Sequence, residues 1–152
     1  MRVVLGTDGS ADAARAIAWV TACLPMAAIH LVAVAETPPT RLAPMPGLTL
    51  PEPISEVLLD AGLKQAQQAL AHGQAQLTAA GRGPAATYVR LGNAARAILD
   101  LARGVQADLI VLGPHSHTCL TRLLHGSVSE EVLRAWPGAV LLVGGAVGVA
   151  RT

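Results

Sequence analysis

Residues 109–129 read LIVLGPHSHTCLTRLLHGSVS, and they combine the strand, loop and helix signals on which the fold prediction depends. Four purely apolar residues open the stretch and predict a buried strand, whereas Gly126-Ser127 predicts the start of a helix. Backbone N–H groups in a glycine-containing loop and at a helix N-terminus suit a phosphate. The stretch also carries three of the five histidines and one of the two cysteines. An anion-binding loop, a metal site and an ordinary loop are therefore the three interpretations to compare.

The same alternation of strand and helix signals runs along the whole chain. Apolar or β-branched runs predict strands at residues 2–6, 29–35, 85–91, 107–113 and 139–144. Capping and periodic signals between them predict helices at about residues 11–24, 54–80, 94–103 and 127–136. Because the strands are apolar on both faces, we expect a parallel sheet inside a three-layer α/β/α sandwich. Ligands of such open sheets bind beyond the carboxyl ends of the strands, so the loops after the first, second and fourth strands are the candidate site.

Length and composition exclude several classes of protein. The 152 residues predict a single domain, residues 1–152, that can bury a core without staples. A formal charge of +1, with no Phe, one Tyr and two Trp, argues against nucleic acid as a partner. No apolar run reaches the ~18 residues of a membrane span, so no membrane association is expected. Two distant cysteines and the absence of a signal-peptide pattern predict a reduced, cytoplasmic protein.

Two segments lack a periodic pattern. Residues 37–53 contain six of the ten prolines and predict a long loop or lid. A linker between domains is the competing interpretation, but residues 1–36 are too few to form a domain. Residues 145–152 are expected to form a loose tail.

Some details of packing can also be predicted. We expect Gly81 and Gly104 to end helices, Cys23 to be a small core residue, and both tryptophans to pack where helices meet the sheet. The inward face of the first helix is expected to consist of Ala14, Ile17, Ala18, Thr21 and Leu24.

The spacing of the loop residues resembles the signature of the universal stress protein family. That signature is Gly, two residues, Gly, nine residues, then Gly-Ser or Gly-Thr; here Gly113, Ser116 and Gly126-Ser127 occupy these positions. The segments VVLGTDGS, GNAARAIL before ADLIVLG, and PGAVLLV also look like the family. The resemblance implies a flavodoxin-like (Rossmann-like) fold with a five-stranded parallel sheet in the order 3-2-1-4-5. It also implies a role in the stress response and a homodimer paired through the last strand, residues 139–144.

One branch of this family binds ATP, so the resemblance implies a set of nucleotide-binding residues. Asp8 would lie beside the adenine and ribose, and Val34 would offer its backbone to the adenine edge. Gly113, Gly126 and Ser127 would line the ribose and phosphates. The complete predicted site comprises Thr7, Asp8, Gly9, Ser10, Val34, Gly113, His115, Ser116, Gly126, Ser127, Val128 and Ser129, with ATP as the ligand, with or without Mg²⁺.

Two residues depart from the ATP-binding pattern. Ser116 replaces the second glycine of the signature, and Pro114 removes one backbone N–H from the loop. If position 116 requires a positive φ, serine there costs roughly 1–2 kcal/mol. If it does not, serine keeps its N–H and adds a hydroxyl donor. Both alternatives are open from the sequence.

A metal site is the weaker interpretation of the same loop. His115, His117, Cys119 and His125 offer imidazole and thiolate ligands that suit zinc or nickel. However, the paired Cys-x-x-Cys spacing of structural zinc sites is absent, and we expect no structural metal.

The functional hypothesis is therefore a cytosolic adenine-nucleotide-binding module. The chain has no G-x-x-x-x-G-K-[ST] and no clear general base, so slow ATP hydrolysis or phosphotransfer is the most activity that the sequence leaves open. The alternatives are a dimeric signalling or structural protein of the same fold that binds no nucleotide, and a metal-binding sensor.

Overall fold

The computed structural model describes residues 1–36, 52–114 and 128–144. Within these ranges five parallel strands form one sheet in the order β3-β2-β1-β4-β5, which confirms the order implied by the family resemblance. The strands are β1 (Arg2–Gly6), β2 (Ala28–Ala35), β3 (Ala86–Leu91), β4 (Leu109–Leu112) and β5 (Ala139–Leu142).

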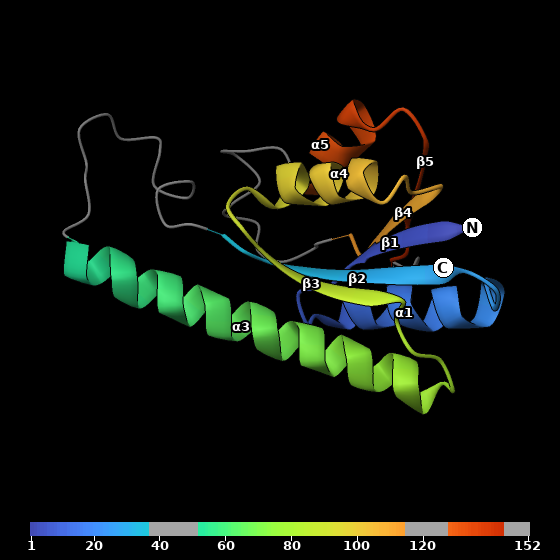
Figure 1. Ribbon diagram of the computed structural model, residues 1–152, viewed down its shortest axis with the longest axis horizontal. Coiled ribbons are helices and arrows are strands. Elements are labelled where there is room, and N and C mark those ends of the chain that lie inside the picture. Colours follow the sequence, from blue (N-terminus) through green and yellow to red (C-terminus); the bar gives the residue numbers. More distant parts are fainter. Residues whose placement is uncertain (37–51, 115–127, 145–152) are drawn as a thin grey trace, which may run out of the picture.

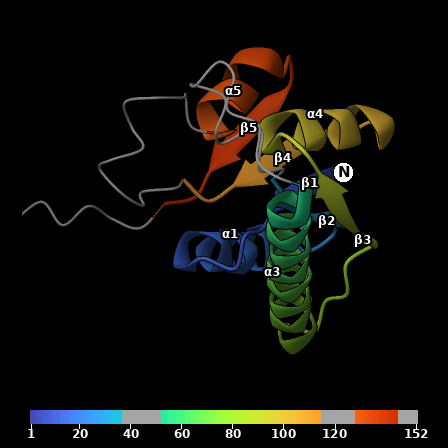
Figure 2. The same ribbon diagram turned by 90° about the vertical axis from the view of Figure 1, so that its left-hand side faces the viewer.

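Helices cover both faces of the sheet, as predicted. α1 and α3 lie on one face, and α4 and α5 lie on the other (Figure 1, Figure 2). The molecule is thus a three-layer α/β/α sandwich of the flavodoxin-like type. The helices are α1 (Ala11–Cys23), α3 (Glu52–Ala79), α4 (Ala94–Gly104) and α5 (Val128–Ala135).

Alternating side chains of the central strands supply two separate cores. Val3 and Leu5 of β1 belong to the cluster beneath α1 and α3, whereas Val4 between them belongs to the cluster beneath α4 and α5. All three are fully buried. Because successive side chains of a strand point to opposite faces, a strand covered on both sides must be apolar throughout. This explains the unbroken apolar runs of β1 and β4.

α3 approaches the sheet closely because its inward face carries small residues. A Cβ added at Gly73 would lie 3.2 Å from Ile17 Cδ1 and 3.2 Å from Leu31 Cδ2. Ala66 and Ala69 are buried against the end of β2 in the same way. The helix has 28 residues, about 42 Å at 1.5 Å per residue, and its amino-terminal part extends past the sheet (Figure 1).

Helix ends follow the predicted capping residues, with one correction. Asn93 Oδ1 accepts from Arg96 N at 2.8 Å, and Gly81 has the predicted positive φ of 73°. α4 ends at Gly104, as predicted, but this glycine is not the left-handed residue of the C-terminal cap. Val105 is the C-cap, and Gln106 takes the left-handed position with φ 53°. Gln106 N donates to Arg103 O and Ala107 N donates to Ala102 O, and these two bonds form a Schellman motif.

The predicted inward face of α1 is correct only for Ile17, which is buried, and Leu24, which packs against the same core. The buried stripe consists of Asp12, Ala13, Ala16, Ile17 and Val20. Ala18 and Cys23 are exposed, and Trp19 is 37% exposed, so neither Cys23 nor Trp19 is a core residue. Trp136 does pack against the cluster beneath α4 and α5. α1 has apolar residues around most of its circumference, so the sequence could not select the face that the sheet covers.

Some predicted segments fall outside the described residues. These are residues 37–51 of the predicted loop or lid and the predicted tail 145–152, whereas residues 52 and 53 begin α3. Among the described helices, none combines the length and apolar character needed to cross a membrane.

The two cores lead to a stability prediction on α3. Leu77 is fully buried, so Leu77→Ala should lower the free energy of unfolding by about 2–5 kcal/mol. Leu58, on the same helix, is 44% exposed, so the matched control Leu58→Ala should change it by less than about 0.5 kcal/mol. Urea unfolding followed by circular dichroism measures both variants. Equal losses would contradict the packing of α3 described above.

Candidate functional site at the carboxyl ends of the strands

The loop after β1 is a turn held together by its own side chains. Gly9 N donates to Thr7 Oγ1 at 3.4 Å, and Ser10 N donates to Asp8 Oδ1 at 3.0 Å. Ser10 is the N-cap of α1, since its Oγ accepts from Ala13 N at 3.2 Å. Gly9 has a φ of 78°, which favours glycine. The hydroxyls of Thr7 and Ser10 accept in these bonds and retain a proton to donate to a ligand.

Gly113 brings the loop after β4 into contact with this turn. A Cβ added at Gly113 would lie 2.6 Å from Asp12 C and 2.7 Å from Ala13 N. Both atoms belong to the backbone of the first turn of α1, so neither can move aside as a flexible side chain can. The start of the loop after β4 therefore lies against the first turn of α1, which directly follows the loop after β1.

Val34 lies beside the same turn. Thr7 N donates to Val32 O at 2.8 Å, which continues the parallel pairing of β1 with β2 beyond Gly6. Val34 is two residues further along β2 and is partly buried. The carboxyl end of β2 thus lines the predicted site next to Asp8, which is exposed.

The first turn of α5 contributes the last described residues of the predicted site. Val128 begins the helix, and Ser129 is buried at 8% exposure. Glu130 and Glu131 occupy the same turn, where they interact favourably with the helix dipole. Their charges also make this turn less attractive to a phosphate, so any phosphate contact depends chiefly on the loop that precedes it.

Most of that loop lies outside the described residues. The predicted contacts His115, Ser116, Gly126 and Ser127 belong to it, as do the metal candidates His117, Cys119 and His125. These assignments stay predictions. In the part of the chain that the structure describes, no group of three or more His, Cys, Asp or Glu side chains could hold a metal ion.

Asp12 is a residue of this region that the sequence did not single out. Its carboxylate is buried at 4% exposure beneath the site and forms an ion pair with Arg15 one turn along α1. Its backbone is the surface against which Gly113 packs. The available signal was an acidic residue in the first turn of a helix, which usually means only a favourable dipole interaction.

The described groups can take part in binding a ligand. The turn after β1 offers the hydroxyls of Thr7 and Ser10 and the exposed carboxylate of Asp8. Such groups hold the sugar and polar edges of a ligand at the position where doubly wound sheets bind nucleotides.

Comparison with protein families gives a match over nearly the whole chain. The model of the universal stress protein family matches residues 1–144. A universal stress protein from Thermus aquaticus is 35% identical over 141 residues, which is 93% of this chain and 96% of that protein.

Solved structures show the same fold with two different ligands. A universal stress protein in complex with cAMP is 30% identical, with a TM-score of 0.66 and coverage of 94% of this chain and 96% of that one. A universal stress family protein from Arabidopsis thaliana with AMP bound has a TM-score of 0.67 and covers 97% and 93% of the two chains. At 13% identity, the second likeness shows the shared fold alone.

Gly113 provides a direct test of the contact between the two loops. Gly113→Ala should lower the free energy of unfolding by about 1–3 kcal/mol, because the new methyl group overlaps backbone atoms of α1. The matched control is Gly104→Ala, whose added Cβ meets nothing within 4 Å. That change should stabilise α4 by about 0.5–1 kcal/mol. Urea unfolding of both variants measures the difference, and an unchanged stability of Gly113→Ala would contradict the contact.

Proposed function

This chain belongs to the universal stress protein family, and from that premise we propose that it is a cytosolic, homodimeric module that binds an adenine nucleotide at the carboxyl ends of β1, β2 and β4. The contact of Gly113 with the first turn of α1 carries this proposal. It supports the proposal because Gly113 begins the loop that leads to the predicted phosphate-binding residues, and the first turn of α1 directly follows the loop that holds Asp8. In this proposal the adenosine of the nucleotide lies at the loop after β1 and its phosphates lie at the loop after β4.

Each part of the ligand then has a proposed partner. The backbone of Val34 faces the adenine edge, and the exposed carboxylate of Asp8 accepts from a ribose hydroxyl. The phosphates lie along the backbone N–H groups of Gly126 and Ser127 at the start of α5. The relative that binds cAMP supports an adenine nucleotide as the ligand class, because it shares 30% of its sequence with this chain. ATP, with or without Mg²⁺, is the proposed ligand.

Calorimetric titration tests nucleotide binding. ATP, ADP, AMP and cAMP are titrated into the intact protein, and the nucleotide released by denaturing the natively purified protein is identified in parallel. Asp8→Asn should weaken binding about tenfold, equivalent to 1.4 kcal/mol, because it removes the charge yet keeps an oxygen for Ser10 N. Asp60→Asn, an exposed change on α3, is the matched control and should leave affinity unchanged.

Absence of bound nucleotide would overturn the proposal. If no nucleotide is released and no heat is measured at millimolar ATP, a dimeric protein of the same fold that binds no nucleotide becomes the better description. Ser116 and Pro114, which depart from the ATP-binding signature, would then be the residues that prevent binding.

The proposed homodimer uses the outer edge of β5. This strand is at one end of the sheet, and Leu142 on it is 37% exposed. Leu141 and Val143 instead pack partly against the core beneath α1, so changes there would also disturb the fold.

Leu142→Glu should therefore convert the dimer to a monomer, because two introduced carboxylates would face each other across paired strands. Sedimentation velocity measures the mass of the particle. The matched control is Leu91→Glu on the opposite edge strand, where Leu91 is 54% exposed and the dimer should persist. A folded Leu142→Glu variant that sediments as a dimer would refute pairing through β5.

A further inference from the structure

The free edge of β3 is a second surface without an assigned role. β3 is the end strand of the sheet opposite β5, and no described helix or strand lies beyond it (Figure 2). Its six residues pair with β2 on one side. On the other side, no hydrogen bond within the described ranges satisfies its outward N–H and C=O groups. Such an edge is a template for one more strand unless charge or a bulge blocks it.

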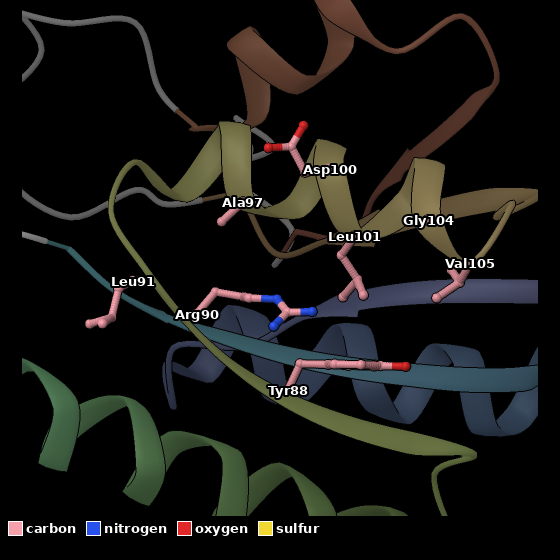
Figure 3. A pocket seen from close by; sticks show the side chains of 8 residues that line it. All are labelled: Tyr88, Arg90, Leu91, Ala97, Asp100, Leu101, Gly104 and Val105. Atoms are coloured by element: carbon pink, nitrogen blue, oxygen red, sulfur yellow. The ribbon is translucent and has the colours of Figure 1, made fainter.

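A groove of about 450 Å³ runs beside this edge, between β3 and α4 (Figure 3). Tyr88 and Arg90 are two residues apart on β3 and line one wall. Ala97 and Leu101 of α4, with Val105 directly after the helix, recur every four residues and line the other. Gly104 keeps the groove open, because a side chain there would project into empty space.

The groove carries a guanidinium without a carboxylate partner among the described residues. Arg90 Cζ lies 5.2 Å from the centroid of the Tyr88 ring, and its side chain runs between β3 and α4 (Figure 3). Asp100 at the rim is paired with Arg103, at 3.3 Å between Arg103 Nη1 and Asp100 Oδ1. The groove lining therefore holds one cation, Arg90, and one carboxylate, Asp100, and Arg103 pairs with that carboxylate.

His30 holds Tyr88 from the neighbouring strand. Its Nδ1 lies 3.2 Å from the Tyr88 hydroxyl, and the two rings are stacked with centroids 6.0 Å apart. Burial, and to a lesser extent the charge of Arg2, lowers the pKa of His30, which favours the neutral form of the ring. Tyr88 is thus fixed in place, and Arg90 is the cation that a ligand would meet.

We propose that β3 and this groove bind an extended acidic segment of a partner protein as an added β-strand. The backbone of the segment would pair with the outward groups of residues 86–91. Alternate side chains of a strand face the same side, so every second residue of the segment would face α4. One of these would be a carboxylate at Arg90, and the next would be an apolar side chain against Leu101 and Val105. Backbone pairing supplies affinity and the groove supplies specificity.

Charge complementarity favours such a partner over a second copy of this chain. The sequence of β3, ATYVRL, contains no acidic residue. Two copies paired through β3 would bring two arginines to the interface and supply no carboxylate from either strand. A segment of a different, acidic protein satisfies Arg90, and the site is independent of the nucleotide proposed at the carboxyl ends of the strands.

Titration of a labelled peptide into the full-length protein tests the proposal. The probe is a threonine-rich octapeptide with one glutamate and two apolar residues at alternate positions. Fluorescence anisotropy measures its binding. Nuclear magnetic resonance should show shifts confined to the amides of residues 86–91 and α4. The same peptide with lysine in place of glutamate should bind at least about tenfold more weakly. An N-methylated version, which cannot pair its backbone, should lose binding.

Charge reversal in the protein provides the matched test. Arg90→Glu should weaken binding of the acidic peptide at least about tenfold and should strengthen binding of the lysine peptide. Arg96→Glu, an exposed reversal on α4 outside the groove lining, should change neither. Equal binding of both peptides, full binding of the N-methylated peptide, or no binding at about 1 mM would overturn the proposal. If the wild-type protein self-associates and Arg90→Glu abolishes that association, the proposal would also be overturned. The occupant of the β3 edge would then be a second copy of this chain.

Discussion

The close contact between Gly113 and the first turn of α1 is the constraint on which the candidate site depends. β1 and β4 are adjacent and parallel, but the chain leaves them toward opposite faces of the sheet, to α1 and toward α5. Glycine at position 113 allows the backbone at the end of β4 to rest directly on the backbone of the first turn of α1, where any side chain would overlap it. The contact lies where the winding of the sheet reverses, which is the position of ligands in doubly wound sheets.

Small side chains play the same part elsewhere in the molecule. The chain has no Phe, and it brings elements together by reducing side chains to hydrogen or methyl where they cross. Gly73 lets α3 reach Ile17 and Leu31, and Gly6 leaves room for Leu112 of β4. Dense packing of short side chains gives many weak contacts at close range, so added volume is tolerated poorly at these points.

The two proposed surfaces lie on different parts of the sheet and use different chemistry. The turn after β1 offers hydroxyls and an exposed carboxylate, which suit a sugar. The edge of β3 offers an aromatic ring, a guanidinium and backbone groups that pair with nothing in residues 1–36, 52–114 and 128–144, and these suit an acidic peptide. A protein that binds a nucleotide at one surface and a partner at another has the components of a nucleotide-responsive adaptor.

The sequence by itself determined the strands and helices, because apolar runs and capping residues act over a few neighbouring positions. The strands, the cap at Asn93 and the turn at Gly81 follow from such local patterns. With the family signature it also predicted the strand order and Gly113 as a site residue. Only the tertiary structure decided which face of the alanine-rich α1 is buried, that Cys23 is exposed, and that Gly113 meets Asp12 and Ala13. It alone placed Tyr88 and Arg90 opposite Leu101. These contacts join residues far apart in the chain, so they depend on strand register and helix rotation, which local patterns do not encode.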